Sequence, residues 1–101
     1  MQILERCRLV QEFTSVGREA FLTSRLSQEA TIRCLEVIGE ATRRISDATK
    51  RAWPKVPWRD VAELRNTLIH QYEAVTPLEV WNTATRIVPR IELWVGRIRL
   101  P

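Results

Sequence analysis

Apolar residues recur every three or four positions over long stretches of this chain, and this spacing limits the possible folds more than any other feature. The clearest stretch follows Ser27, a residue type common at helix N-caps, with Glu29 in the first turn. Its apolar positions are Ala30, Cys34, Val37, Ile38, Ala41, Ile45 and Ala48. The pattern predicts one long amphipathic helix that starts at Ser27 and continues to about Ala48.

Two other stretches have the same spacing. Near the N-terminus, Ile3, Cys7 and Val10 predict a helix from Gln2 to about Thr14. Gly17 is a plausible stop, and a short helical turn is expected around residues 18–22. Later in the chain, Thr76, Pro77 and Glu79 have the order of an N-cap, a first-turn proline and a first-turn acid. They predict another helix, with a kink where Pro89 interrupts it.

The segment RAWPKVPWRD (residues 51–60) separates these helices. Pro54 and Pro57 each lack a backbone donor and bias the preceding residue away from helix, so the segment predicts a linker with a sharp turn. Trp53 and Trp58 are expected to hold this linker on the core. The next helix should begin near Pro57 or Trp58 and run to about Tyr72.

No stretch alternates with the period of two that marks a half-buried strand. With 101 residues, one hydrophobic core is the expected outcome, so residues 1–101 are predicted to form a single domain. The predicted fold is all-α, an antiparallel bundle of about four helices. The apolar stripes are broad, which predicts a homodimer, although burial within one chain accounts for the same stripes.

Arginine supplies 14 of the 16 basic residues, in a chain with 12 acidic residues and a net charge of +4. Because the planar guanidinium matches phosphate geometry, this usage favours a polyanionic partner, although a solvated surface has the same composition. Cys7 and Cys34 stand 27 positions apart without a CxxC pair, so no zinc site and no metal are predicted. Two buried free thiols are expected, in a protein of the cytoplasm with no membrane span.

The segment RNTLIHQY (Arg65–Tyr72) contains the only histidine and the only tyrosine of the chain. On a helix with ~100° per residue, Arg65 and His70 point roughly 140° apart, whereas Arg65 and Tyr72 share a face. That face is otherwise apolar, so Arg65 needs a carboxylate, an anion or a route to solvent. One interpretation is structural: Arg65 pairs with an acid such as Glu36, Glu40 or Asp60, while His70 and Tyr72 cap the helix end.

Four short motifs occur in a familiar order. They are IGEA (Ile38–Ala41), VPWRD (Val56–Asp60), RNTLIHQY and Val80-Trp81. In IGEA, Gly39 and Ala41 suit close helix packing, and Glu40 is a candidate partner for an arginine. Over nearly the whole chain, this set resembles the HepT-like proteins of the HEPN superfamily.

The resemblance implies a function as well as a helical fold. A HepT-like protein is a metal-independent endoribonuclease toxin of a type II toxin–antitoxin pair. It acts as a dimer on RNA, without a cofactor, and its partner is an MntA-type nucleotidyltransferase antitoxin. Matched by motif position, the catalytic residues are Arg65 and His70, Asn66 supports them, and Tyr72 is the residue that the antitoxin modifies with AMP.

The chemistry of these residue types fits that implication. A histidine that titrates near neutrality can accept and return a proton, and an arginine can bind two phosphate oxygens. Because each chain has one histidine, a separate base and acid require two chains. The alternative is a non-catalytic helical subunit that binds a nucleotidyltransferase and uses RNTLIHQY only for packing or nucleotide contact.

Overall fold

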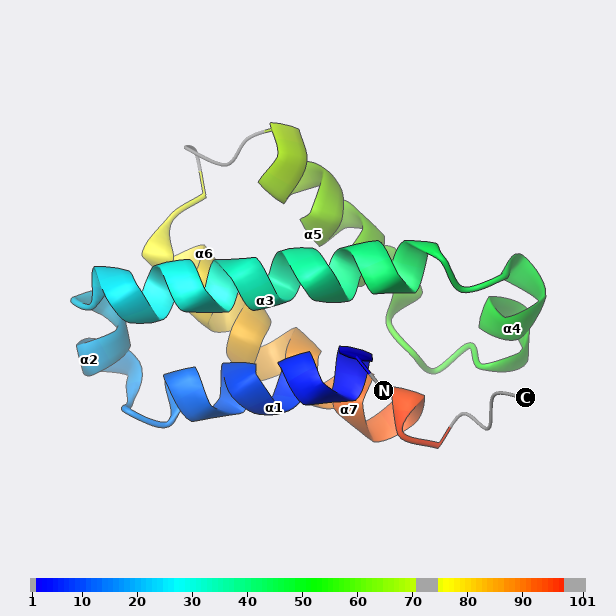
Figure 1. Ribbon diagram of the computed structural model, residues 1–101, viewed down its shortest axis with the longest axis horizontal. Helices are drawn as coiled ribbons and strands as arrows, with labels where there is room; N and C mark the ends of the chain where they lie inside the picture. The colour runs from blue at the N-terminus through cyan, green and yellow to red at the C-terminus, as the bar shows by residue number, and fades with distance from the viewer. Residues whose placement is uncertain (1, 71–74, 98–101) are drawn as a thin grey trace.

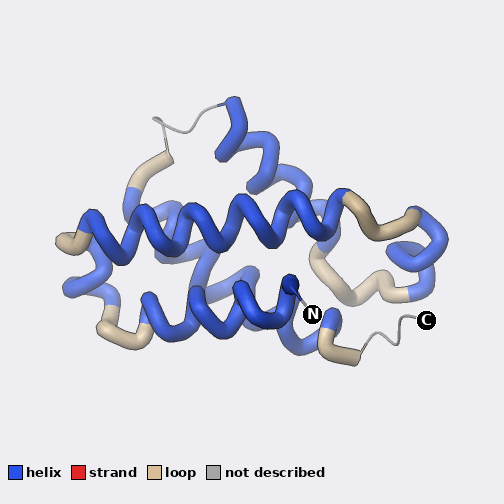
Figure 2. The backbone as a smooth tube through the Cα atoms, viewed as in Figure 1, coloured by secondary structure: helices blue, strands red, loops and turns tan. Residues whose placement is uncertain are grey.

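The fold is an all-α bundle, described by a computed structural model for residues 2–70 and 75–97, without the side chains of residues 69 and 70 (Figures 1 and 2). The described ranges contain no strand. The helices are α1 (Gln2–Thr14), α2 (Arg18–Leu22), α3 (Arg25–Arg43), α4 (Asp47–Ala52), α5 (Trp58–His70), α6 (Pro77–Asn82), the π-helical turn η2 (Thr83–Ile87) and α7 (Val88–Val95). Four long helical stretches, α1, α3, α5 and α6–η2–α7, confirm the predicted bundle.

The core lies where α1, α3 and α7 meet. Helices α1 and α3 lie side by side and antiparallel, and α7 packs against α1 (Figure 1). The buried side chains at this junction include Cys7, Val10, Leu35, Ile38, Ile91 and Val95. Their spacing on each helix follows the stripes read from the sequence, so the apolar pattern places these three helices around one core.

The predicted start of the long central helix is wrong by three residues. Ser24, not Ser27, is the N-cap of α3, and its hydroxyl accepts a hydrogen bond from the Ser27 backbone N–H. The sequence offers two serines at a capping spacing, and the earlier one gives the helix an additional turn. Leu26, in that turn, is 80% exposed, so it does not extend the buried apolar stripe.

The predicted end of that helix is also wrong. Helix α3 stops at Arg43, and a separate short helix, α4, begins after Ser46, whose hydroxyl accepts from the Thr49 N–H. Ala48 therefore belongs to α4, and Arg51 and Ala52 are helical rather than part of the linker. The prediction was wrong because the apolar spacing in the sequence continues past Arg43, whereas the Ser46 cap starts a new helix there.

Beyond α4, the linker has the predicted anchor residues. Trp53 and Trp58 both pack against the core, and the Trp58 indole N–H donates to the Trp53 carbonyl at 2.9 Å. This bond ties the end of α4 to the start of α5. It fixes where α5 leaves the bundle.

The last helical stretch confirms the predicted start, and it departs from a regular α-helix beside Pro89. Thr76 caps α6 through the Glu79 N–H, with Pro77 in the first turn. Near Pro89 the chain forms the π-turn η2, in which the Val88 N–H bonds to the Thr83 carbonyl, five residues earlier. A proline cannot donate to the carbonyl four residues before it, so the wider turn absorbs the interruption.

Candidate active site at the crossing of α3 and α5

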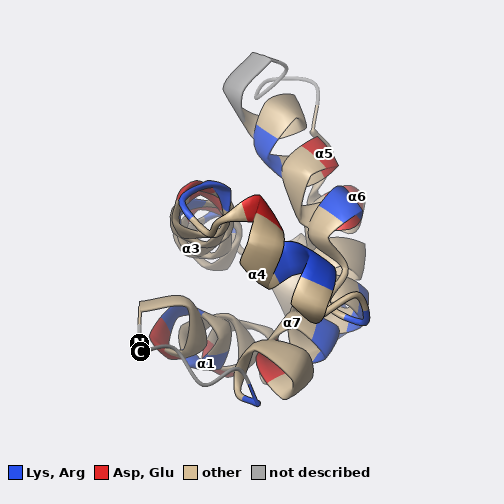
Figure 3. Cartoon of the chain, turned by 90° about the vertical axis from the view of Figure 1, so that its right-hand side faces the viewer, with Lys and Arg blue, Asp and Glu red and all other residues tan. Residues whose placement is uncertain are grey.

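Helix α5 packs mainly on α3, crosses it obliquely and points its C-terminal end away from the other helices (Figures 1 and 3). Gly39 makes the close approach possible. A Cβ at that position would lie 3.0 Å from the Arg65 Cβ and 3.3 Å from its Cγ. The IGEA motif is therefore a close-packing site, as predicted, and the residue it admits is Arg65.

Arg65 is held by the neighbouring residue of the same motif. Its Nε–H donates to Glu40 Oε2 at 2.8 Å, and its side chain is 25% exposed. Arg43 Nη2 donates to the other oxygen of Glu40 at 3.3 Å. One carboxylate thus joins two guanidiniums, and the structural interpretation of Arg65 named the correct partner among its three candidates.

The ion pair changes the titration of Glu40. The Arg65 hydrogen bond is the largest cause that holds the Glu40 pKa below its ordinary value of 4.5, and Arg43 acts in the same direction. Burial opposes this shift but is the weaker effect. Glu40 is therefore ionised at neutral pH and fixes the orientation of the Arg65 guanidinium.

Arg65 retains hydrogen-bonding capacity after this pairing. Only Nε bonds to Glu40, and within residues 2–68 and 75–97 its two terminal nitrogens make no hydrogen bond. A guanidinium can therefore use one edge for a structural carboxylate and offer its remaining donors to a phosphate. The structural and catalytic interpretations of Arg65 are compatible.

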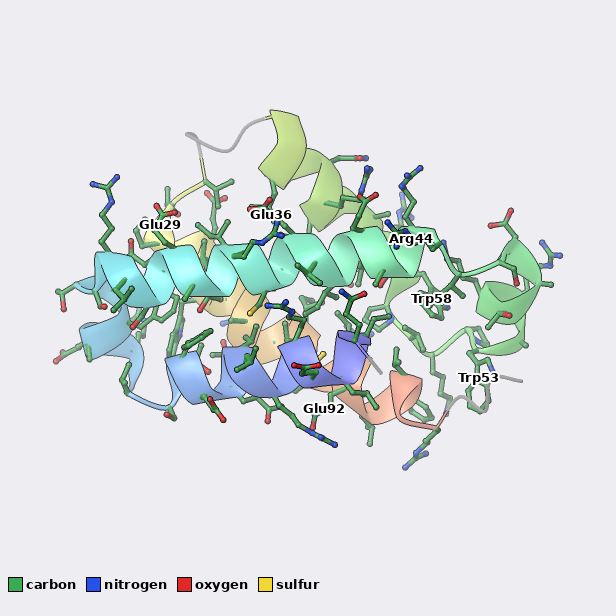
Figure 4. The ribbon with its side chains drawn as sticks, in the orientation of Figure 1. Glu29, Glu36, Arg44, Trp53, Trp58 and Glu92 are labelled. Atoms are coloured by element: carbon green, nitrogen blue, oxygen red, sulfur yellow. The ribbon has the colours of Figure 1, made fainter. Side chains whose placement is uncertain are left out.

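Two cavities adjoin the Arg65 side chain. One, of about 270 Å³, lies along α3 and includes Arg33, Glu36, Glu40 and Arg44 in its lining. Figure 4 shows Glu36 and Arg44 along α3, with Arg44 near its end. This cavity contains both signs of charge, three arginines and two glutamates.

The second cavity, of about 140 Å³, has a different electrostatic character. Its charged residues are Arg65, Arg43 and Lys50, and Asn66 and Trp58 also line it. No carboxylate is part of this lining. An anionic group placed here would meet Lys50, the Asn66 amide and two guanidiniums whose charge Glu40 offsets only in part, so this cavity suits a phosphate better than the first.

The structure describes the backbone of the motif as far as His70. Arg65, Asn66 and His70 belong to one uninterrupted α-helix, so the distorted helix that could bring Arg65 and His70 to one face is not present. The angular separation of roughly 140° therefore stands for the backbone. The His70 side chain and the whole of Tyr72 lie outside the described residues.

Lys50 and Arg43 were missed as possible site residues in the sequence. Lys50 lies on α4, a helix that the apolar pattern did not reveal, and it reaches the site only through the fold. The one available signal was charge: the segment around the Pro54 linker is rich in basic residues. That signal does not say which helix those residues approach.

Neither cysteine is suited to nucleophilic chemistry. Cys7 and Cys34 are free and buried, as expected. Burial is the main cause that raises the Cys7 pKa to about 12, and the negative charge of Glu92 adds to it. In the described ranges no three His, Cys, Asp or Glu side chains are grouped as a metal site, and no helix has the length and apolarity needed to cross a membrane.

Comparison with known proteins identifies the family. The family model "Ribonuclease HepT-like" matches residues 3–98. A Thermococcus cleftensis protein named "Probable ribonuclease HepT" is 40% identical over 91 residues, which is 89% of this chain and 83% of the relative. A Methanocaldococcus jannaschii protein named as a candidate RNase is 37% identical over 91 residues, 89% of this chain and 84% of the relative.

A bacterial relative shows a similar extent of likeness. A candidate RNase of Caldanaerobacter subterraneus is 32% identical over 97 residues, 95% of this chain and 87% of the relative. No solved structure matches the chain significantly. The family match over almost the whole chain, together with the helical fold, shows that this protein belongs to the HepT-like ribonuclease family.

Proposed function

We propose that this protein is a metal-independent endoribonuclease, the toxin of a toxin–antitoxin pair that acts in the cytoplasm. In this proposal His70 transfers protons, Arg65 binds the scissile phosphate, and Asn66 orients the phosphate or the imidazole. The observation that carries the proposal is how Arg65 is bonded. Glu40 holds its Nε, and among the described residues its two terminal nitrogens remain available as donors. Arg65 also lines the cavity that contains Arg43 and Lys50, and it lies on the same helix as His70.

The proposed reaction is an internal transfer at the phosphate. The ribose 2′-oxygen loses its proton to a base and bonds to phosphorus, the bond from phosphorus to the 5′-oxygen breaks, and that oxygen takes a proton. The products are a 2′,3′-cyclic phosphate and a free 5′-hydroxyl. An imidazole can serve as base or acid, and an arginine stabilises the charge that develops on the phosphate oxygens.

The single histidine per chain supports a site shared between two copies. Base and acid act at opposite sides of the phosphorus atom, and one imidazole cannot hold both positions at once. Since α5 projects away from the bundle in Figure 1, its C-terminal end is a surface that a second copy could approach. The proposed active form is therefore a homodimer in which His70 of each chain takes part.

Tyr72 is the proposed point of control. A nucleotidyltransferase antitoxin would join the Tyr72 phenol oxygen to the α-phosphorus of ATP, with release of pyrophosphate and of the phenolic proton. An AMP group two residues from His70 adds bulk and negative charge where RNA must bind. After co-expression with the antitoxin, intact-mass analysis should show AMP-sized increments that Tyr72→Phe removes, and their absence from the wild type would contradict this role.

A second function has one observation in its favour. Glu40 satisfies the Arg65 charge within one chain, so Arg65 does not need a substrate to be stable. A non-catalytic subunit that binds a nucleotidyltransferase would have this feature as well. Such a subunit would bind its nucleotidyltransferase partner and would not cut RNA.

Product analysis distinguishes the two functions and tests the proposed chemistry. Purified protein should cut single-stranded RNA in EDTA and leave 2′,3′-cyclic phosphate ends. Cutting that EDTA abolishes would contradict the metal-independent reaction. No cutting by protein freed of its antitoxin and of AMP would favour the non-catalytic subunit.

A further inference from the structure

Positive charge in this chain is concentrated in one segment. Residues 43–59 contain six basic residues and one acidic residue, a net charge of +5, whereas the rest of the chain has ten basic and eleven acidic residues, a net charge of −1. Most of this segment forms α4 and the linker to α5. Figure 3 looks onto this end of the molecule, with the basic residues of α4 in front.

Three of the cations at this end lie over indole rings. Lys50 Nζ lies 5.9 Å from the Trp58 ring centroid, and Lys55 Nζ lies 5.1 Å from that of Trp94. The Arg97 guanidinium lies 4.7 Å from the same Trp94 ring. Other basic side chains pair with carboxylates. Examples away from this end are Arg25–Glu29 and Arg33–Glu36, and examples at this end are Arg43–Glu40, Arg59–Glu63 and Arg90–Asp60.

This difference matters for binding an anion. A carboxylate holds an arginine in place but neutralises its charge, so a phosphate must compete with it. An indole ring holds a cation through its quadrupole and leaves the net positive charge intact. Lys50, Lys55 and Arg97 are thus oriented without being neutralised.

These cations are connected to the candidate active site. Trp58 lines the 140 Å³ cavity that contains Arg65, Asn66 and Lys50. It also lines a neighbouring hollow of about 570 Å³, together with Lys55 and Trp94. The two hollows share the Trp58 side chain, so Lys50 and Lys55 line adjoining hollows, and Arg97 lies over the Trp94 ring of the second. The second hollow also contains one carboxylate, Asp60, which pairs with Arg90.

We infer that Lys50, Arg51, Lys55 and Arg97, here called the α4 basic surface, bind the single-stranded RNA that flanks the cleaved bond. The inference rests on the proposed ribonuclease function and adds a binding site outside its catalytic residues. The surface contacts the RNA backbone, and it supplies affinity rather than base recognition. An acidic protein surface is the competing occupant, but the shared lining with Arg65 and Asn66 favours the substrate.

A binding assay with RNA that cannot be cut tests this directly. The probe is a single-stranded 2′-O-methyl RNA, which lacks the attacking 2′-hydroxyl and can be used with the wild-type protein. For Lys55→Gln/Arg97→Gln, affinity should fall roughly 10- to 30-fold at about 0.1 M salt, and the slope of log K against log salt should decrease by about 1.4, because each contact contributes about 0.7. Fluorescence anisotropy across a salt series measures both.

The matched control removes two charges from α1 and α2, which line neither hollow. Arg8 on α1 and Arg18 on α2 are exposed, and Arg8→Gln/Arg18→Gln makes the same change in net charge. This variant should bind the probe within about twofold of the wild type, since long-range electrostatics alone is screened at this salt. Thermal melting of both variants checks that they fold.

Cleavage assays separate this inference from the proposed function. The Lys55→Gln/Arg97→Gln variant should cut a long RNA with a raised KM and a dinucleotide at the wild-type rate. If both double variants weaken binding of the RNA probe equally, or if neither weakens it, the proposed role of the α4 basic surface is wrong. Loss of antitoxin binding with unchanged RNA affinity overturns it too, in favour of a protein partner. If neither the wild type nor its variants cut RNA while the binding difference persists, the proposed function fails and the binding site stands.

Discussion

Glu40 determines what Arg65 can do, because the two side chains meet across the Gly39 contact with 2.8 Å between Nε and Oε2. A carboxylate that only neutralised the arginine would argue for a structural role. Here it occupies one nitrogen and leaves the terminal donors free of partners among the described residues. Glu40 is best understood as the residue that positions the proposed phosphate-binding group.

Arg65→Ala should abolish RNA cleavage without unfolding the protein. The alanine keeps the Cβ that packs on Gly39, and the lost ion pair is partly exposed. Cleavage should fall at least about a hundredfold, as for removal of a donor that stabilises transition-state charge. Arg25→Ala, which breaks the exposed pair with Glu29, is the control and should cut RNA normally. An Arg65→Ala protein that fails to fold would show that the arginine is structural.

Glu40→Gln should alter stability in a pH-dependent way. The folded-state pKa of Glu40 is lowered below 4.5 by Arg65, so the carboxylate stabilises the folded state at neutral pH. That contribution is lost as the pH falls below 4.5 and through the lowered folded-state value. The wild type should therefore melt at a higher temperature than Glu40→Gln at pH 7, and the difference should vanish in acid. A difference that is constant over this range would exclude the ion pair as its source.

At the scale of helices, the close crossing of α3 and α5 depends on Gly39, which has no side chain. Gly39→Ala would place a Cβ 3.0 Å from the Arg65 Cβ, which is a stem atom and cannot swing away. Overpacking should outweigh the better helix propensity of alanine, for a net loss of roughly 1 kcal/mol, and should displace Arg65. Denaturant melts and cleavage rates measure the two effects. Unchanged stability and unchanged cleavage together would mean that α5 is not held at this distance.

The sequence predicted helices well where the apolar pattern and the caps agreed. The bounds Gln2–Thr14 and the short helix at residues 18–22 match the structure, as does the Thr76 cap with Pro77 behind it. It failed around α3 and α4, where Ser24 and Ser46 impose ends that the apolar pattern does not contain. Periodicity reports which face is buried, whereas a cap decides where the backbone turns.

The candidate site was predictable only in part for the same reason. The requirement that Arg65 find a partner followed from its apolar face, and IGEA gave Glu40 as a candidate. Lys50 could not be predicted, because its approach to Arg65 depends on the break between α3 and α4 and on the Trp53–Trp58 hydrogen bond. Such contacts come from the path of the chain, which local spacing does not specify.

At the scale of the whole molecule, the proposed activity requires two copies. If each site uses His70 of both chains, a dimer of one wild-type and one His70→Ala chain should not cut RNA. After equal mixing and exchange about a quarter of the dimers keep both histidines, so activity should fall to about a quarter of that of the same total amount of wild type. Native mass spectrometry confirms the exchange of subunits. Activity that stays at about half despite exchange would show that His70 of one chain acts without that of its partner.

The account as a whole rests on the chemistry of His70, and a single-turnover cleavage assay tests it most directly. Wild-type protein and His70→Ala are compared on the same RNA in EDTA, with thermal melting to confirm that both are folded. Loss of the proton-transfer group should lower the rate at least about a hundredfold. Expression of His70→Ala should also relieve the growth arrest that the wild type causes. Equal cleavage by both proteins, with equal growth arrest, would contradict the proposed active site.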